Sequence, residues 1–251
     1  MLESLPDAAS LSMVLTGAFI AGFVTGFAGF GTGLVSSGLW FHALPAPMVP
    51  PLVALASVAA QIVGLATVRQ AFEWRRALPY LIGGFAGVPL GVAALKFATP
   101  ETLRFSVGGF LVAYAAFQLS GVGRLRIATW GGRPSDGIIG AGGGFLGGFA
   151  GLSGPLPLVW LQMRGGTSAE QRATYQPFNL IVLVAASVGM SATGAIDGGV
   201  LAVAALCLPV TVIGAWIGAR VYTGVSETAF RGIVLVLLLV SGLILVVQGI
   251  A

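Results

Sequence analysis

The chain has 251 residues, of which 57% are hydrophobic and only 8% are charged. An ordinary soluble domain carries roughly a quarter charged residues, so this composition excludes a soluble enzyme and predicts an integral membrane protein. The formal net charge is +4, but the basic residues stand singly or in small groups between apolar runs, which indicates membrane loops rather than a nucleic-acid surface. The first ten residues contain no Lys or Arg, so we expect no secretory signal peptide there.

Six apolar runs are long enough to cross a membrane. A hydrocarbon core of about 30 Å takes roughly 20 helical residues. The runs are continuously apolar rather than alternating, so they predict helices and not barrel strands, and Thr99-Pro100-Glu101 is a helix-start signal before the third run. In chain order, the predicted spans are residues 50–68, 77–95, 105–121, 173–196, 198–219 and 232–251.

Two further stretches, residues 10–44 and 137–163, are too long for one span and too short for two comfortable spans. Glycine and proline weaken a continuous helix, so we expect each stretch to be broken. Gly26, Gly29, Gly31 and Gly33 interrupt the first stretch, and Gly147, Gly148, Gly151, Gly154, Pro155 and Pro157 interrupt the second.

The distribution of Lys and Arg decides how these two stretches cross. If each is a single span, the 12 basic residues divide six against six between the two sides, and no orientation is preferred. If each is a hairpin that returns to its starting side, ten share one side and only Lys96 and Arg104 oppose them, which fits the positive-inside rule. We therefore predict two hairpins, a cytoplasmic linker at residues 122–135 and periplasmic termini. Whether the hairpins cross fully or re-enter to mid-depth stays open.

The two halves of the chain resemble each other. Residues 22–29 match residues 144–151 at six of eight positions, and Glu101-Thr102 recurs further on as Glu227-Thr228. The sequence therefore predicts an all-α membrane protein with an internal repeat, in which residues 1–121 and 136–251 each form a glycine-broken hairpin followed by three transmembrane helices. Because each half has an odd number of segments, the second half must be inverted, and inverted repeats with broken helices are a recurrent transporter design.

The two interruptions form the candidate substrate site. A break frees backbone N–H and C=O groups, which a membrane protein tolerates only where the backbone is buried in protein or lines a wet cavity. A helix that restarts after the break directs its N–H groups and positive dipole end into that cavity, which suits a small anion. No Lys or Arg lies in the middle of a predicted span, so neutral donors would hold the anion. The candidate substrate-binding residues are Gly29, Gly31, Thr32, Gly33, Ser57, Gln61, Gly151, Ser153, Gly154, Gln176 and Asn179, and no catalytic residue, metal ligand or cofactor is predicted.

Structural interpretations compete with these assignments. The Thr32 and Ser153 hydroxyls could bond back to their own helices, and Gln176 and Asn179 could cap a helix near the inner surface. Small residues in membrane helices most often serve close packing. This packing interpretation is preferred for Gly87, Gly91, Gly214 and Gly218.

Motifs of soluble enzymes are missing from the sequence. There is one histidine, so no histidine-based metal cluster can form, and no P-loop lysine follows the glycines. The segment Gly151-Leu152-Ser153-Gly154-Pro155 lacks the final glycine of a nucleophile elbow. We therefore expect no enzyme activity.

With these motifs in view, the chain resembles the sulfite exporter TauE/SafE family of bacterial inner-membrane permeases. The resemblance lies in the Gly-Phe-Ala-Gly motif that opens each half, in Pro155-Leu156-Pro157-Leu158 and in Gln176-Pro177-Phe178-Asn179, and it covers nearly the whole chain. It implies a permease for small sulfur-containing anions such as sulfite, sulfonates or related organosulfur compounds. Val53 stands where the repeat would place a counterpart of Asn179, which favours a site biased toward the second half.

Three functions stay open at this point. A secondary transporter that works by alternating access is favoured by the predicted inverted repeat. A passive channel for a small anion or neutral solute ranks second, because the sequence lacks an obvious ring of charge or a carbonyl filter. A membrane enzyme or assembly scaffold ranks third. The expected partners are the small anion and the lipid bilayer, with no nucleic acid, whereas homo-oligomerisation, transport direction and the coupling ion stay open.

Overall fold

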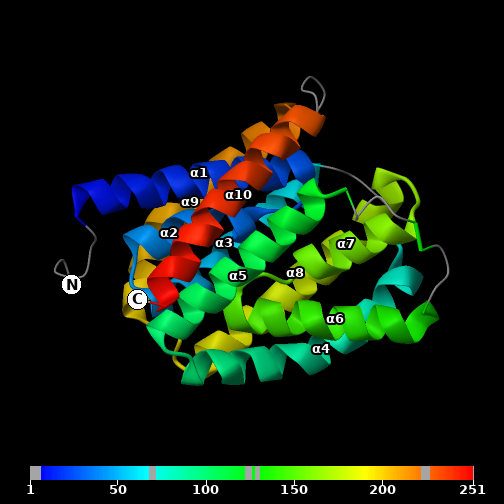
Figure 1. The fold of residues 1–251 in the computed structure, drawn as a ribbon, viewed down its shortest axis with the longest axis horizontal. Coiled ribbons are helices and arrows are strands. Elements are labelled where there is room, and N and C mark those ends of the chain that lie inside the picture. Colours follow the sequence, from blue (N-terminus) through cyan, green and yellow to red (C-terminus); the bar gives the residue numbers. More distant parts are fainter. Residues whose placement is uncertain (1–6, 68–71, 122–125, 128–130, 222–226, 251) are drawn as a thin grey trace.

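The computed structural model describes residues 7–67, 72–121, 126–127, 131–221 and 227–250, which form helices joined by turns (Figure 1). Two predicted features lie partly outside the described residues. These are residues 1–6 of the N-terminal stretch without Lys or Arg, and residues 122–125 and 128–130 of the predicted linker 122–135. The α-helices are α1 (Ala8–Ala28), α2 (Thr32–Ala43), α3 (Val49–Thr67), α4 (Trp74–Phe97), α5 (Pro100–Leu119), α6 (Gly132–Ala150), α7 (Pro155–Arg164), α8 (Ser168–Ala192), α9 (Gly198–Val221) and α10 (Glu227–Ile250), and a short 3-10 turn η1 (Ala46–Met48) precedes α3.

Six helices of the described chain are long and apolar enough to cross a membrane. They are α1, the continuous helix formed by η1 and α3, and α4, α5, α8 and α9. Five of the predicted spans fall in this set, and the sixth falls in α10, which contributes a shorter apolar segment, Val234–Ile250. The composition-based prediction of a multi-pass helical membrane protein is therefore confirmed.

Helix ends follow capping signals more closely than hydropathy. Thr99 is the N-cap of α5 and Pro100 lies in its first turn, as predicted. The predicted span 173–196 was wrong at both ends. α8 begins at Ser168 because Thr167 and Glu170 form a capping box. It ends at Ala192, just before Gly194 adopts a left-handed φ of 77°.

The first glycine-rich stretch folds into two helices that turn back on each other. Gly29 caps α1 in the left-handed conformation, with φ of 81°, which glycine adopts without steric cost. After the break, α2 returns along α1, and the Trp40 indole N–H donates to the Val14 carbonyl at 3.0 Å. The tip of the first hairpin is therefore the segment 29–31.

The second glycine-rich stretch repeats this arrangement. Gly151 caps α6 with φ of 73°, and α7 returns along α6, so that Arg164 Nη2 donates to the Gly132 carbonyl at 2.7 Å. The two return helices, α2 and α7, have 12 and 10 residues. At the rise of an α-helix they are about 18 and 15 Å long, roughly half of a hydrocarbon core. Neither return helix is long enough to cross alone.

Two helix pairs, α1 with α9 and α4 with α6, pack with their backbones in contact. In Figure 1, α4 and α6 run side by side along one edge of the molecule. A Cβ atom added to Gly87 would lie 2.0 Å from the Ala141 carbonyl oxygen, and one added to Gly214 would lie 2.3 Å from the Phe19 carbonyl oxygen. Such contacts leave no room for any side chain larger than hydrogen. The packing interpretation is confirmed for Gly87, Gly91, Gly214 and Gly218.

The centre of the molecule is formed by α3 and α8, which contact each other and the two helix pairs (Figure 1). These helices bury polar side chains among apolar ones. The group comprises Ser57, Gln61, Gln176 and Asn179, each at most 6% exposed. Because buried polar groups are costly in a membrane protein, they direct attention to the space between the central helices and the hairpin tips.

Candidate functional site

Both hairpin tips and both central helices enclose one small cavity near the middle of α3 and α8. Its volume is about 20 Å³, which is room for about one water molecule, so the surrounding side chains nearly fill this space. Phe30, Leu34, Leu152 and Leu183 contribute apolar wall. Nine of the predicted site residues line it: Gly31, Thr32, Gly33, Ser57, Gln61, Gly151, Ser153, Gly154 and Asn179.

At the first tip, the hydroxyl groups close the hairpin. The Thr32 backbone N–H donates to Thr25 Oγ1 at 2.6 Å, and the two threonine hydroxyls are also hydrogen-bonded to each other. The Ser36 hydroxyl donates to the Thr32 carbonyl at 2.6 Å, one turn along α2. The Thr32 hydroxyl therefore bonds across the hairpin to α1 rather than back to its own helix, and the residue also lines the cavity.

At the second tip, the side chains of two predicted site residues meet. The Ser153 hydroxyl donates to Asn179 Oδ1, joining the break after α6 to the centre of α8. Gly154 lies against the same amide, since a Cβ atom on it would be 3.2 Å from Oδ1. With its carbonyl oxygen engaged by Ser153, the Asn179 side chain retains an NH₂ group that can donate to an anion. Asn179 lies inside α8, so helix capping is the wrong interpretation for it.

Two side chains of α3 leave polar atoms unsatisfied in the cavity wall. Gln61 Nε2 donates to the Gly29 carbonyl at 3.2 Å, but Gln61 Oε1 and the Ser57 hydroxyl have no hydrogen-bond partner among the described residues. Both side chains are at most 3% exposed. Because nearly all buried polar groups in proteins are hydrogen-bonded, unsatisfied atoms of this kind indicate a bound water or ligand.

Gly29 and Gln176, the other two predicted site residues, lie outside the cavity lining. Gly29 presents its carbonyl to Gln61. Gln176 is 1% exposed and packs against Gly29, because a Cβ atom on Gly29 would be 3.1 Å from its Nε2 atom. Gln176 also lies inside α8 rather than at its end. Both residues therefore support the first tip rather than line the cavity.

Sequence reasoning missed Arg172, which stands just before the predicted span 173–196. It is 7% exposed and its Nη2 donates to the Phe27 carbonyl at 3.0 Å, while the Tyr175 hydroxyl donates to the Ala28 carbonyl at 3.2 Å. A cation at the C-terminus of α1 complements the helix dipole. The spacing of Arg172, Tyr175 and Gln176 places them on one helix face, which is the signal that could have identified this support.

The restarting helices α2 and α7 both begin at the cavity, but they offer different donors. The first turn of α2 contains Gly33 and Leu34, each with a backbone N–H. The first turn of α7 contains Pro155 and Pro157, which have none. The positive dipole ends converge on one place, and α2 supplies more backbone donors there.

The cavity draws on both halves of the chain unequally. Val53 packs against Gly151, since a Cβ atom on Gly151 would lie 2.7 Å from Val53 Cγ1, so the first half has an apolar side chain where the second has Asn179. In return, the first half supplies Ser57 and Gln61. Polar side chains from both halves therefore line the cavity, and the bias toward the second half that Val53 suggests stays a prediction.

Comparisons with known proteins agree with this architecture. A family model described as sulfite exporter TauE/SafE matches residues 14–245. The chain is also 28% identical over 202 residues to the probable sulfite/organosulfonate exporter TauE of Cupriavidus necator, and the match covers 76% of each chain. No solved structure matches the chain. Among the described residues, no group of three or more His, Cys, Asp or Glu side chains is placed to hold a metal ion.

Proposed function

We propose that this chain, which belongs to the sulfite exporter TauE/SafE family, is a secondary transporter that moves a small sulfur-containing anion across the bacterial inner membrane by alternating access. Members of this family are transporters and not enzymes. The relative from Cupriavidus necator is named as a probable exporter of sulfite or organosulfonates. The proposed substrates are accordingly sulfite, sulfonates and related organosulfur compounds.

The observation that carries the proposal is the unsatisfied Ser57 hydroxyl on α3, a donor that faces the cavity together with the Asn179 amide. Ser57 and Gln61 are buried at a point where α2 and α7 both begin. A sulfite or sulfonate oxygen can accept from the Ser57 hydroxyl, from the Asn179 amide and from the N–H groups of the first turn of α2. Neutral donors of this kind bind an anion without trapping it, which transport requires.

The helix pairing supports an inverted repeat of residues 1–121 and 136–251. α1 packs on α9 as α6 packs on α4, and α5 packs on α10. The left-handed caps Gly29 and Gly151 occupy corresponding positions in the two halves. An exchange of the halves maps the α1–α9 contact onto the α6–α4 contact and the α5–α10 contact onto itself, as a two-fold axis in the membrane plane would.

The proposed orientation places the linker 122–135 in the cytoplasm and both termini in the periplasm. It rests on the ten-against-two distribution of basic residues that the hairpin arrangement produces. With this orientation, Lys96 and Arg104 lie on the periplasmic side, whereas the N-terminus of α4 and the C-terminus of α7 face the cytoplasm.

Alternating access is favoured over a passive channel by the size of the central cavity. A channel needs a continuous wet path, whereas the cavity here holds about one water molecule. Transport of a four-atom oxyanion therefore requires the hairpin tips to separate from α3 and α8. Such gating fits a binding site that faces one side at a time.

Flux measurements in proteoliposomes test the proposal. We expect saturable uptake of sulfite or methanesulfonate, with counterflow of labelled anion against unlabelled anion. Asn179→Ala is expected to raise KM by about tenfold or more, because a hydrogen bond to a charged group contributes about 1.5–3 kcal/mol. Ser187→Ala is the matched control on the same helix, since its hydroxyl donates to its own backbone, to the Leu183 carbonyl at 2.8 Å.

Two results would contradict the proposal. Absence of saturable flux for every sulfur-containing anion tested would reject the substrate class. Flux that neither saturates nor shows counterflow would identify a channel instead of a transporter.

A further inference from the structure

A second and much larger cavity lies at the ends of α4, α6 and α7 that face the proposed cytoplasmic side. Its volume is about 610 Å³. Arg75, Arg76, Arg133 and Arg164 line this cavity, and Asp136 is the one acid among its lining residues. The lining therefore carries four positive charges and one negative charge, a net of +3. We call this cavity the arginine vestibule.

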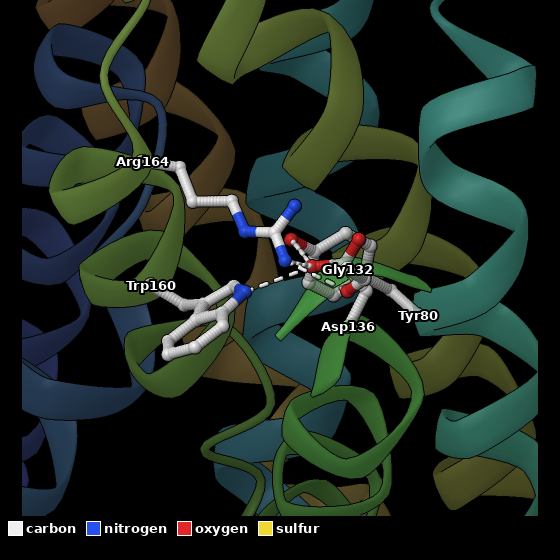
Figure 2. Close-up of polar contacts among 5 residues, drawn as sticks. All are labelled: Tyr80, Gly132, Asp136, Trp160 and Arg164. Atoms are coloured by element: carbon white, nitrogen blue, oxygen red, sulfur yellow. Dashed lines mark hydrogen bonds and ion pairs between the residues drawn. The ribbon is translucent and has the colours of Figure 1, made fainter. Parts of the chain in front are cut away.

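The single acid of the arginine vestibule holds three partners through one carboxylate oxygen. Asp136 Oδ1 accepts from the Tyr80 hydroxyl at 2.7 Å and from the Trp160 indole N–H at 2.8 Å, and it pairs with Arg164 at 3.3 Å (Figure 2). The Arg164 guanidinium also lies over the Trp160 ring, 5.3 Å from its centroid. These contacts tie α4, α6 and α7 together and neutralise Arg164. The exposed guanidinium groups on α4 and α6 supply the remaining charge.

An aromatic pair stands between the arginine vestibule and the central cavity. Tyr80, which lines the vestibule, packs edge-on against Phe178, with ring centroids 6.3 Å apart and an angle of 71° between the rings. Phe178 is 0% exposed and directly precedes Asn179, which lines the central cavity. An anion that moves from the vestibule along α8 therefore passes this pair of rings.

We propose that the arginine vestibule is a loading site that binds the oxyanion head of the substrate from the cytoplasm before it enters the central cavity. The inference rests on the proposed function and adds to it a second anion site on the side from which an exporter loads. Guanidinium groups match the oxygens of sulfite and sulfonate with paired hydrogen bonds. A cleft lined by one sign of charge raises the local concentration of counter-ions and their association rate.

A phospholipid phosphate presents the same oxyanion chemistry, and the arrangement of arginines separates the two sources. Arg75 and Arg133 also line an adjoining groove with Leu78 and Ile82, which are 56% and 64% exposed and suit acyl chains. Arg76 lines the arginine vestibule but not this groove. A substrate site therefore depends on Arg76, whereas a lipid site depends on the arginines of the groove.

Binding stoichiometry tests the loading site directly. The full chain in phosphatidylcholine nanodiscs is titrated calorimetrically with sodium sulfite and with sodium methanesulfonate. We expect two anions per wild-type chain and a loss of affinity of about tenfold at one of them in Arg76→Gln, since a charge-assisted pair contributes more than a neutral hydrogen bond. Lys96→Gln removes the same charge from an exposed position at the opposite end of α4 and should retain both sites.

Transport kinetics give the second readout. Arg76→Gln should raise KM about tenfold for anion supplied from the cytoplasmic side, with Vmax in that direction unchanged. This difference should shrink between 0.01 M and 0.15 M salt, because the Debye length falls from about 30 Å to about 8 Å. Asn179→Ala should instead weaken binding of the other anion, the one in the central cavity, by about tenfold.

Each contrary result has a distinct meaning. Wild-type stoichiometry and KM in Arg76→Gln would overturn the loading site while leaving the proposed transport intact. No saturable flux in the wild-type protein would overturn both. A lipid site gives a third pattern. In that case phosphatidylglycerol raises the melting temperature only while Arg75 and Arg133 are intact, and Arg76→Gln binds sulfite normally. This result would reject the loading site, because a lipid headgroup would then occupy the region.

Discussion

Replacing Gly87 by alanine should separate α4 from α6 and disturb a substrate site that Gly87 does not touch. The added Cβ atom would lie 2.0 Å from the Ala141 carbonyl oxygen and 2.7 Å from the Phe145 nitrogen. Both obstacles are backbone atoms of a helix, so no rotamer change relieves the clash. The two helices must move apart along the line of the contact.

The size of the effect follows from these distances. Ordinary van der Waals contact begins at 3.4 Å, so the 2.0 Å contact of Gly87 requires about 1.4 Å of displacement. Overpacking of this kind costs about 1–3 kcal/mol, and rigid backbone on both sides favours the upper end. Because α6 leads directly into the tip that bears Ser153, the bond from Ser153 to Asn179 is stretched too. Displacements of about 1 Å reduce the function of a preorganised site by up to about a hundredfold.

The assay combines thermal unfolding in detergent with sulfite flux in proteoliposomes. Gly87→Ala should lower the melting temperature and reduce flux by at least about tenfold. Gly109→Ala on α5 is the matched control, because a Cβ atom there meets nothing within 4 Å. Alanine is the better helix former by up to about 1 kcal/mol, so the control should keep or slightly raise stability. Normal stability and normal flux in Gly87→Ala would refute the packing argument.

Three further experiments test other contacts. In a double-mutant cycle, the free-energy change in KM for Ser153→Ala with Asn179→Ala should be smaller than the sum of the two separate changes. Additive changes would show that the hydrogen bond between the two side chains does not affect KM. Arg172→Gln should destabilise the protein by about 1–2 kcal/mol, seen as a lower melting temperature, by removing the cation at the end of α1. Asp136→Asn should lower stability by about 1–2 kcal/mol, because it unpairs Arg164, yet raise apparent anion affinity at low salt; weaker anion binding would contradict the charge argument.

The sequence was sufficient where one local rule governs the outcome. Continuous apolar runs located the membrane helices, and Thr99 with Pro100 located the start of α5. Glycines at helical spacing in adjoining spans predicted close packing at Gly87 and Gly214. Each of these predictions needs only the chemistry of a residue and its neighbours along the chain.

The sequence was insufficient where the partner lies far along the chain. Arg172 follows a loop and looked solvated, yet it is buried because the end of α1, 145 residues away, presents its carbonyls there. Gln176 looked like a ligand or a cap, but it packs beneath Gly29. The pairing of Asp136 with Tyr80 and Trp160 was not predicted either, because none of these residues belongs to a recognisable motif.

The glycine contacts also constrain how the central cavity can open. Backbone contact along α4 and α6 couples the two helices, since sliding either past the other would drive carbonyl oxygens into glycine Cα atoms. The same holds for α1 and α9. Each hairpin should therefore move with its partner span. Widening of the cavity should come from displacement of one helix pair against α3 and α8, where side chains such as Val53 and Val182 make many of the contacts. If rigid helix pairs rock against α3 and α8, each hairpin tip stays intact while the cavity opens to one side of the membrane or the other. A clash at Gly87 lies within such a pair, so it should impair transport in every conformation rather than favour one of them.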